Sequence, residues 1–160
     1  MDSTSPSTLN RRRVLLTSAA LGGSVLLISV RPAKAATVGD LASVMAAYAG
    51  GATVSAGKVK LQVSELVDNG NVVPITITVD SPMSAASHVK AIALFNEKNP
   101  QREVAKFVLG PHSGKATVST RIRLATTQKL VAVAQMSDGS FWSGSADVIV
   151  TLAACIEGEV

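Results

Sequence analysis

Residues 116–152 read ATVSTRIRLATTQKLVAVAQMSDGSFWSGSADVIVTL. In the first nine of these residues, apolar and polar side chains alternate, which is the period of a half-buried β-strand. Asp138-Gly139 is a typical turn pair of a tight β-hairpin, and it follows the apolar run 129–136. This stretch therefore predicts consecutive strands that are joined by short turns.

The residues upstream extend the same pattern to about seven short strands. The further predicted strands are 59–63, 73–79, 88–95 and 104–109, and turn signals lie between them. Pro74 argues that its strand is an edge strand or that it lies near a strand start. This spacing of strands and turns is typical of an all-β fold, and we expect an immunoglobulin-like antiparallel β-sandwich. The cysteine pair of antibody domains is absent, so the expectation concerns the architecture alone.

A short helix is predicted before the first strand, over residues 38–48. Its apolar residues follow helical spacing, Asp40 is a plausible N-cap, and Gly50-Gly51 ends it. The chain contains only five aromatic residues, so Val, Ile, Leu and Ala must build most of the core. Phe141 and Trp142, after the hairpin turn, are expected to pack in the core or to line a groove.

Residues 1–35 are predicted to be a twin-arginine export signal. Arginines at 11–13 precede the apolar stretch 14–30, and Ala33-Lys34-Ala35 fits a signal peptidase site. A general secretory signal and an uncleaved membrane anchor are the alternatives. The export route predicts a periplasmic protein that folds before it crosses the membrane, with residues 36–152 as its domain and 153–160 as a C-terminal arm.

Cleavage of this signal would change the charge of the protein. The whole chain has a net charge of +4, but residues 36–160 contain ten basic and ten acidic residues. The charge of the predicted mature chain is therefore close to zero. This balance argues against binding to nucleic acid or to a membrane surface.

The predicted domain contains no catalytic motif that we recognise. GxSxG, Walker and HExxH patterns are absent. His88 and His112 have no ligand spacing that selects a third partner, so no metal or other cofactor is expected. Arg121 and Arg123 share the polar face of a strand. They are expected to be solvated, and binding of an anionic group is the alternative.

Cys155 is the only cysteine of the chain and lies in its C-terminal tail, AACIEGEV. In an exported protein, an unpaired cysteine indicates either a reactive thiol or an intermolecular disulfide. The residue follows Leu152 by three positions, or about 10 Å of extended chain. We expect an exposed thiol on a short projecting arm; packing of the thiol against the domain, next to Ile156, is the alternative.

The residues quoted above carry a resemblance to a known family. The stretches VPITITVDSPMSAASHVKAIALFNEKNP and HSGKATVSTRIRLATTQKLVAVAQMSDGSFWSGSADVIVTLAAC resemble SoxY, a subunit of the bacterial thiosulfate-oxidising Sox system. The resemblance runs from about Val38 to Cys155. It implies a periplasmic carrier that is not itself an enzyme and that holds sulfur intermediates covalently on the cysteine.

The resemblance also implies partner proteins. A SoxZ-like subunit would form a heterodimer with this chain, and a c-type cytochrome would conjugate thiosulfate to the cysteine. A dimanganese hydrolase would then release sulfate, and a molybdenum enzyme would oxidise the remaining sulfane sulfur. No cofactor is implied beyond the covalent sulfur group on Cys155.

The tail differs from the family pattern, which is Gly-Gly-Cys-Gly-Gly. Ala153-Ala154 precede Cys155, and Ile156-Glu157-Gly158 follow it. Alanine restricts the backbone more than glycine does, Ile156 is bulky, and Glu157 adds a negative charge. These changes leave a related carrier with a different client as one alternative. An assembly or binding domain that forms an interchain disulfide through Cys155, and an adhesion or chaperone-like domain, are the others.

Overall fold

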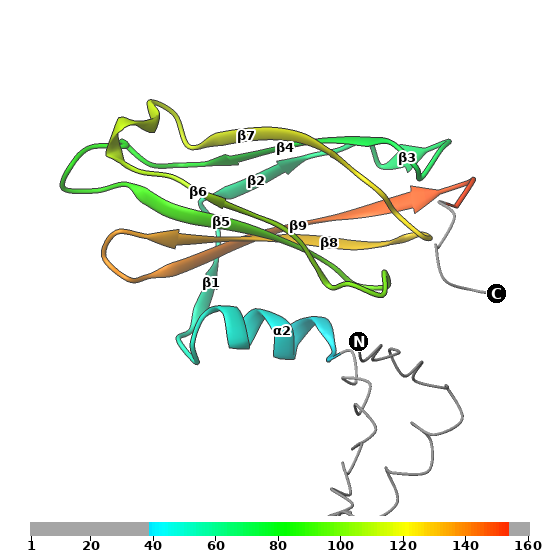
Figure 1. Cartoon of the computed structure of the whole chain (residues 1–160), viewed down its shortest axis with the longest axis horizontal. Helices are drawn as coiled ribbons and strands as arrows, with labels where there is room; N and C mark the ends of the chain where they lie inside the picture. Colours follow the sequence, from blue (N-terminus) through cyan, green and yellow to red (C-terminus); the bar gives the residue numbers. More distant parts are fainter. Residues whose placement is uncertain (1–38, 154–160) are drawn as a thin grey trace, which may run out of the picture. The chain divides into compact units, whose positions relative to one another are not determined.

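The computed structural model of the chain describes residues 39–153. Two β-sheets lie face to face, and a single helix covers the outer face of the larger sheet (Figure 1). This arrangement confirms the predicted all-β sandwich with a short N-terminal helix. The predicted export signal and all of the arm except Ala153 lie outside the described residues. Within the described part of the chain, no helix has the length and apolar character needed to cross a bilayer.

The smaller sheet is antiparallel, with the strand order β2-β4-β7. Its strands are β2 (Val59–Gln62), β4 (Val73–Val79) and β7 (Thr117–Ile122). The larger sheet has the order β1-β9-β8-β5-β6, and β3 pairs with β9 beside this path. Its strands are β1 (Val54–Ala56), β9 (Phe141–Val150), β8 (Gln128–Met136), β5 (Val89–Asn96), β6 (Glu103–Val108) and β3 (Leu66–Val67). A short 3-10 helix, η1 (Pro111–Ser113), precedes β7.

The main differences from the sequence prediction concern the strands β1, β3 and β9. The short strands β1 and β3 were not predicted, and both pair with β9 in parallel. β9 is one continuous strand from Phe141 that ends at Val150, where the sequence had suggested regular structure as far as Leu152. Pro74 is the second residue of β4, and β2 pairs with β4 only from Thr76 onward. The prediction of a strand start at Pro74 is therefore confirmed.

The core has two parts because β5 and β8 are buried on both faces. Their side chains are apolar in nearly continuous runs, which is typical of central strands without a solvent face. One face packs against the smaller sheet around residues such as Ile77, Leu94 and Leu130. The opposite face carries Phe95 and Phe141, which pack against the helix.

The helix α2 (Leu41–Tyr48) has the predicted N-cap and the predicted end, but it begins at Leu41, three residues later than the predicted range 38–48. Asp40 is its N-cap and accepts a hydrogen bond from the Ser43 backbone N–H at 2.9 Å. Hydrogen bonding by Ser43, through its side chain and its backbone, holds the pKa of the Asp40 carboxyl below its ordinary value. Gly50 ends the helix with a positive φ of 61°. Tyr48 then contacts Phe95 edge-to-face, with the ring centroids 5.6 Å apart, and so fixes α2 on the larger sheet.

Gly144 allows β2 and β9 to approach each other closely at one side of the sandwich. A Cβ atom at this position would overlap the backbone carbonyl oxygen of Val59 and would lie 2.9 Å from the carbonyl carbon. Because the obstruction is backbone, a rotamer change cannot relieve it. Gly144→Ala is therefore expected to lower the free energy of unfolding by about 1–3 kcal/mol. Denaturant unfolding measures this loss.

Ser145→Ala is the matched control, since Ser145 is the exposed next residue of β9. We expect it to change the free energy of unfolding by less than about 0.5 kcal/mol. Equal stability of the Gly144→Ala protein and the unmodified protein would contradict the close approach of the two strands.

Candidate functional site

The root of the C-terminal arm is the part of the candidate site that the structure describes. Cys155 and its neighbours Ala154, Ile156, Glu157 and Gly158 lie outside the described residues. Ala153, the last described residue, is exposed. The geometry of the site is therefore that of the surface from which the arm leaves the domain.

Backbone hydrogen bonds hold the chain for two residues beyond β9. The Thr151 N–H donates to the Val67 carbonyl oxygen at 3.0 Å, and its hydroxyl donates to the Asp68 carbonyl oxygen at 3.2 Å. The Gly70 N–H then donates to the Leu152 carbonyl oxygen at 2.8 Å. The segment after β3 thus anchors the chain as far as Leu152. Cys155 follows this anchor by three residues, or at most about 10 Å.

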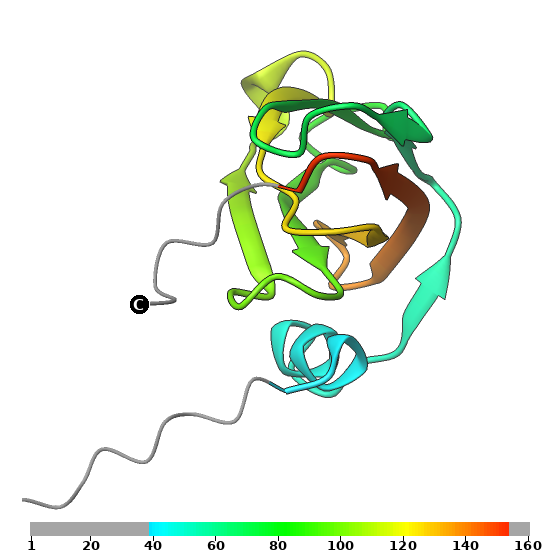
Figure 2. The same ribbon diagram turned by 90° about the vertical axis from the view of Figure 1, so that its right-hand side faces the viewer.

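Gly70 also joins the arm root to the end of β7. Its carbonyl oxygen accepts a hydrogen bond from the Leu124 N–H at 2.8 Å, while its N–H binds Leu152. Arg123 directly precedes Leu124, and Arg121 lies two residues earlier. Both arginines are exposed, as predicted. One end of the sandwich holds β3 together with the ends of β7 and β9 (Figures 1 and 2). The structure therefore places Arg121 and Arg123, for which anion binding was the alternative to a solvated role, at the same end of the domain as the root of the arm.

An amide pair, formed by the half-buried Asn99 and the buried Gln128, holds the segment that contains Arg123. The Asn99 side chain donates to the Arg123 carbonyl oxygen at 2.9 Å and accepts from the Ala125 N–H at 3.0 Å. Gln128, which is only 3% exposed, donates to the same Asn99 side-chain oxygen at 2.6 Å. Sequence reasoning missed this pair. The only signal in the sequence was Gln128, a glutamine at the start of a mostly apolar strand. Its position does not indicate which residue it binds.

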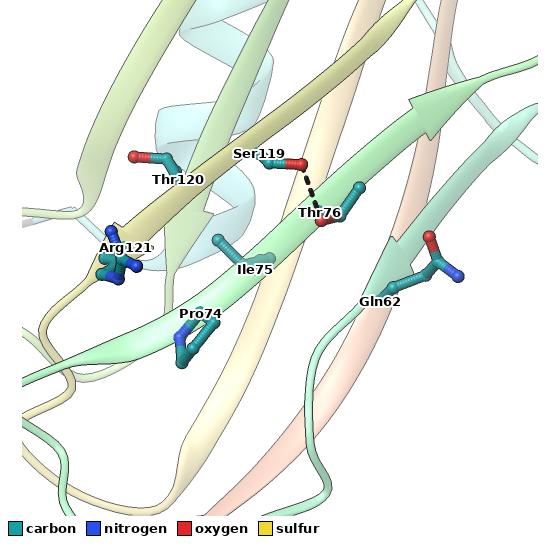
Figure 3. A pocket seen from close by; sticks show the side chains of 7 residues that line it. All are labelled: Gln62, Pro74, Ile75, Thr76, Ser119, Thr120 and Arg121. Carbon is teal, nitrogen blue, oxygen red and sulfur yellow. Dashed lines mark hydrogen bonds between the residues drawn. The ribbon is translucent and has the colours of Figure 1, made fainter.

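A pocket of about 270 Å³ lies on the outer face of the smaller sheet (Figure 3). The Thr76 and Ser119 hydroxyls share a hydrogen bond of 2.8 Å there. Its lining residues are Gln62, Pro74, Ile75, Thr76, Ser119, Thr120 and Arg121. The pocket is open, and polar and apolar atoms share its surface about equally, so its lining alone does not select one class of ligand.

The two histidines lie apart from this surface. His88 precedes β5, and its Nδ1 lies 3.1 Å from the Ser84 carbonyl oxygen. His112 is an exposed residue of η1. No three His, Cys, Asp or Glu side chains gather as a metal site among residues 39–153.

Phe141 and Trp142 have packing roles, as predicted. Phe141 is buried, and its ring contacts Tyr48 with the centroids 5.9 Å apart. Trp142 packs against the core between the sheets, and its indole N–H donates to the Ser140 hydroxyl at 3.1 Å. Lys58 lies over the indole ring at 4.4 Å. The indole is thus covered by residues of its own domain.

Comparison with known proteins identifies the family. The family model described as sulfur oxidation protein SoxY matches residues 45–155. The chain belongs to the SoxY family. The match begins within α2, spans both sheets and the arm root, and extends to Cys155. No curated protein sequence gave a significant match.

Solved structures agree with the family assignment. The sulfur carrier protein SoxY from Chlorobium limicola f thiosulfatophilum is 29% identical, with a TM-score of 0.60. The alignment covers 71% of this chain and 97% of that one. This SoxY family member also shares its fold with superoxide reductases. The one from Ignicoccus hospitalis is 16% identical, with a TM-score of 0.54 and coverage of 59% and 80% of the two chains. A putative one from Thermotoga maritima is 20% identical, with a TM-score of 0.51 and coverage of 61% and 87%. At these identities the likeness concerns the fold alone.

Proposed function

We propose that this chain is an exported sulfur carrier that holds thiosulfate-derived sulfur covalently on Cys155. The observation that carries the proposal is the SoxY match, which extends to Cys155, the only cysteine of the chain. The anchoring of the chain at Leu152 supports it, because only two residues lie between this fixed point and Cys155. A thiol this close to the domain surface can be presented to other proteins at a defined place.

The proposed chemistry begins with oxidation of the thiol together with thiosulfate. The Cys155 thiol and S₂O₃²⁻ form an S–S bond, giving Cys–S–S–SO₃⁻, one proton and two electrons, and a c-type cytochrome accepts the electrons. The thiolate is the reactive form, and an exposed thiol with an ordinary pKa near 8.5 supplies a few per cent of it at neutral pH. Water then cleaves the terminal S–S bond, which leaves Cys–S–SH and releases sulfate.

The carrier needs partners for each of these steps. We propose a SoxZ-like subunit as the heterodimer partner, the c-type cytochrome as oxidant, and a dimanganese hydrolase for sulfate release. A molybdenum enzyme would oxidise the sulfane sulfur that remains. The proposed location is the periplasm, which the protein reaches by the twin-arginine route after cleavage behind residue 35.

The tail sequence sets a condition on these partners. Alanines in place of glycines before Cys155, and Ile156 after it, widen the arm and restrict its backbone. Partner active sites that receive this arm must therefore be wider than those that receive a glycine-flanked one.

Mass spectrometry of the intact protein, purified without reductant, tests the proposal. A carrier is expected to gain the mass of one sulfur atom, or of one S₂O₃ group, on the peptide that contains Cys155. A mass that doubles and returns to the monomer on reduction would instead support an interchain disulfide and would overturn the carrier function. The same protein treated with dithiothreitol provides the unmodified reference mass.

A further inference from the structure

Large apolar side chains are exposed together at the root of the arm. In the described part of the chain, five such side chains are each more than half exposed: Leu66, Val72, Val108, Ile149 and Leu152. All except Val108 belong to the end of the sandwich where β9 ends (Figure 1). Single apolar residues are common on protein surfaces, but a group of four around one point indicates an interaction surface.

Backbone contacts bring these four residues close together. Leu66 and Ile149 are direct neighbours in the parallel pair β3–β9, in which the strands lie about 4.8 Å apart. Leu152 follows β9, and its carbonyl oxygen accepts a hydrogen bond from the Gly70 N–H at 2.8 Å. Val72 follows Gly70 by two positions. We call Leu66, Val72, Ile149 and Leu152 the root patch.

A groove extends the root patch along β9. Its volume is about 440 Å³, and Leu61, Val63 and Ile149 are among the side chains that line it. Polar and apolar atoms share its surface about equally. The root patch therefore offers a partner protein exposed apolar side chains and, beside them, a recess that can receive a side chain.

Charge does not select a partner at this end of the sandwich. Segments 63–72, 97–103, 121–129 and 147–153 meet there, and hydrogen bonds join them to one another. These segments contain five acidic and five basic residues. The acidic residues are Glu65, Asp68, Glu97, Glu103 and Asp147, and the basic residues are Lys98, Arg102, Arg121, Arg123 and Lys129. Because the two signs balance, the root patch, and not a net charge, distinguishes this surface.

The position of Cys155 determines which protein covers the root patch. Only Ala153 and Ala154 lie between Leu152 and Cys155, so the thiol can be at most about 14 Å from the Leu152 backbone. This limit holds for every path of the chain after Ala153. An enzyme that reacts with the thiol must bring its active site within this distance, and its surface around the active site then lies over the residues next to Leu152.

We propose that the root patch is the docking surface for the enzyme that oxidises the Cys155 thiol, and that apolar side chains around the opening of its active site pack against Leu66, Ile149 and Leu152. The proposal rests on the proposed function, since it requires a protein that reacts with Cys155. Apolar contacts are not directional, and a small contact area suits a transient complex. Both properties fit a carrier that must leave one enzyme before it meets the next.

Calorimetric titration tests the docking surface. The complex of this chain with its SoxZ-like subunit is titrated with the oxidised c-type cytochrome, and every sample carries Cys155→Ser so that no reaction follows binding. Addition of Leu66→Thr and Ile149→Thr is expected to raise the dissociation constant about tenfold. Both side chains are more than half exposed and threonine suits a strand, so the fold should be unchanged.

Val108→Thr is the matched control. Val108 is the fifth exposed apolar residue, and it pairs with Ala91 near the start of β5, at the opposite end of the sandwich. This variant should bind the cytochrome as tightly as the protein that carries Cys155→Ser alone. Equal dissociation constants in all three proteins, equal rises in both variants, or no binding by any of them would overturn the proposal.

Sedimentation of the same samples distinguishes the enzyme from two other occupants of the root patch. The Leu66→Thr/Ile149→Thr protein is expected to keep its SoxZ-like subunit and the mass of the unmodified complex. Loss of the subunit would assign the patch to the heterodimer interface, and a smaller number of copies would assign it to a contact between copies of this chain. Either result would overturn docking of the enzyme.

Kinetics with Cys155 in place separate this proposal from the proposed function. Leu66→Thr/Ile149→Thr is expected to raise about tenfold the carrier concentration that gives half the maximal rate of cytochrome reduction, and to leave the maximal rate unchanged. An unchanged half-saturation, with an S₂O₃ group found on Cys155, would overturn docking and leave the carrier function standing. Binding that the two substitutions weaken, without any adduct on Cys155, would contradict the carrier function and retain the docking surface.

Discussion

Replacement of Cys155 by serine is expected to reduce the thiosulfate-dependent electron transfer to the conjugating cytochrome to the background rate. The carrier chemistry requires an S–S bond to the protein, and the chain has no second cysteine that could replace Cys155. A serine hydroxyl is hardly ionised at neutral pH and cannot form that bond. The measurement is the reduction of the cytochrome, followed by its absorbance, in a system reconstituted from this chain, the partner subunit and the cytochrome.

Ala154→Ser is the matched control for this loss. It adds the same hydroxyl group to the arm one residue earlier and leaves the thiol in place. Both variants should unfold at the temperature of the unmodified protein, because Leu152, the last residue that is hydrogen-bonded to the domain in the described part of the chain, is unchanged in both. Electron transfer by Cys155→Ser at more than a small fraction of the normal rate would contradict the role of the thiol.

Replacement of Phe95 by alanine is expected to be the most destabilising single truncation between the larger sheet and α2. Phe95 is fully buried, and its ring contacts Tyr48 edge-to-face. Loss of the ring leaves a cavity beneath the helix, which costs about 3–5 kcal/mol of the free energy of unfolding. For a domain of this size the melting temperature should fall by roughly 10–20 °C. Denaturant unfolding and calorimetry measure these losses.

Phe107→Ala provides the comparison for this prediction. This substitution removes the same side chain from the edge strand β6, where the Phe107 ring is only half-buried. Its cost is expected to be about half that of Phe95→Ala, since the neighbouring solvent can fill the space that the ring leaves. Losses of equal size at the two positions would show that Phe95 has no special role beneath α2.

Local sequence patterns predicted most of the sandwich. Alternation along β4 and β7 marks strands with one buried face, and the uninterrupted apolar runs of β5 and β8 mark strands with two. The cap at Asp40 and the glycines after Ala49 are local signals, so the bounds of the helix followed from them. These features depend on residues that are neighbours in sequence.

The missed strands have a different origin. β1 and β3 contain three and two residues, which is too short for any alternation to be recognised. They exist because β9 offers hydrogen-bonding groups along its edge, and the pairing partner lies more than 80 residues away. The contact that Gly144 permits with Val59 is equally non-local.

The site was predicted in part for similar reasons. Arg121 and Arg123 occupy the polar positions of a regular alternation, so their exposure followed from the sequence. Their place beside the arm root did not follow, because it depends on Gly70, which binds Leu152 on one side and Leu124 on the other. Asn99 and Gln128 hold the same segment through contacts between distant turns. Cys155 itself was singled out by its position and by being the only cysteine, and it lies outside the described residues.

The mass of the peptide that contains Cys155 tests the central claim most directly. The protein is incubated with thiosulfate, the partner subunit and the oxidised cytochrome, then digested without reductant. The peptide is expected to gain one S₂O₃ group as the cytochrome is reduced, and the hydrolase should then leave a single additional sulfur atom on it. Reduction of the cytochrome by thiosulfate while Cys155 remains an unmodified thiol would contradict the account.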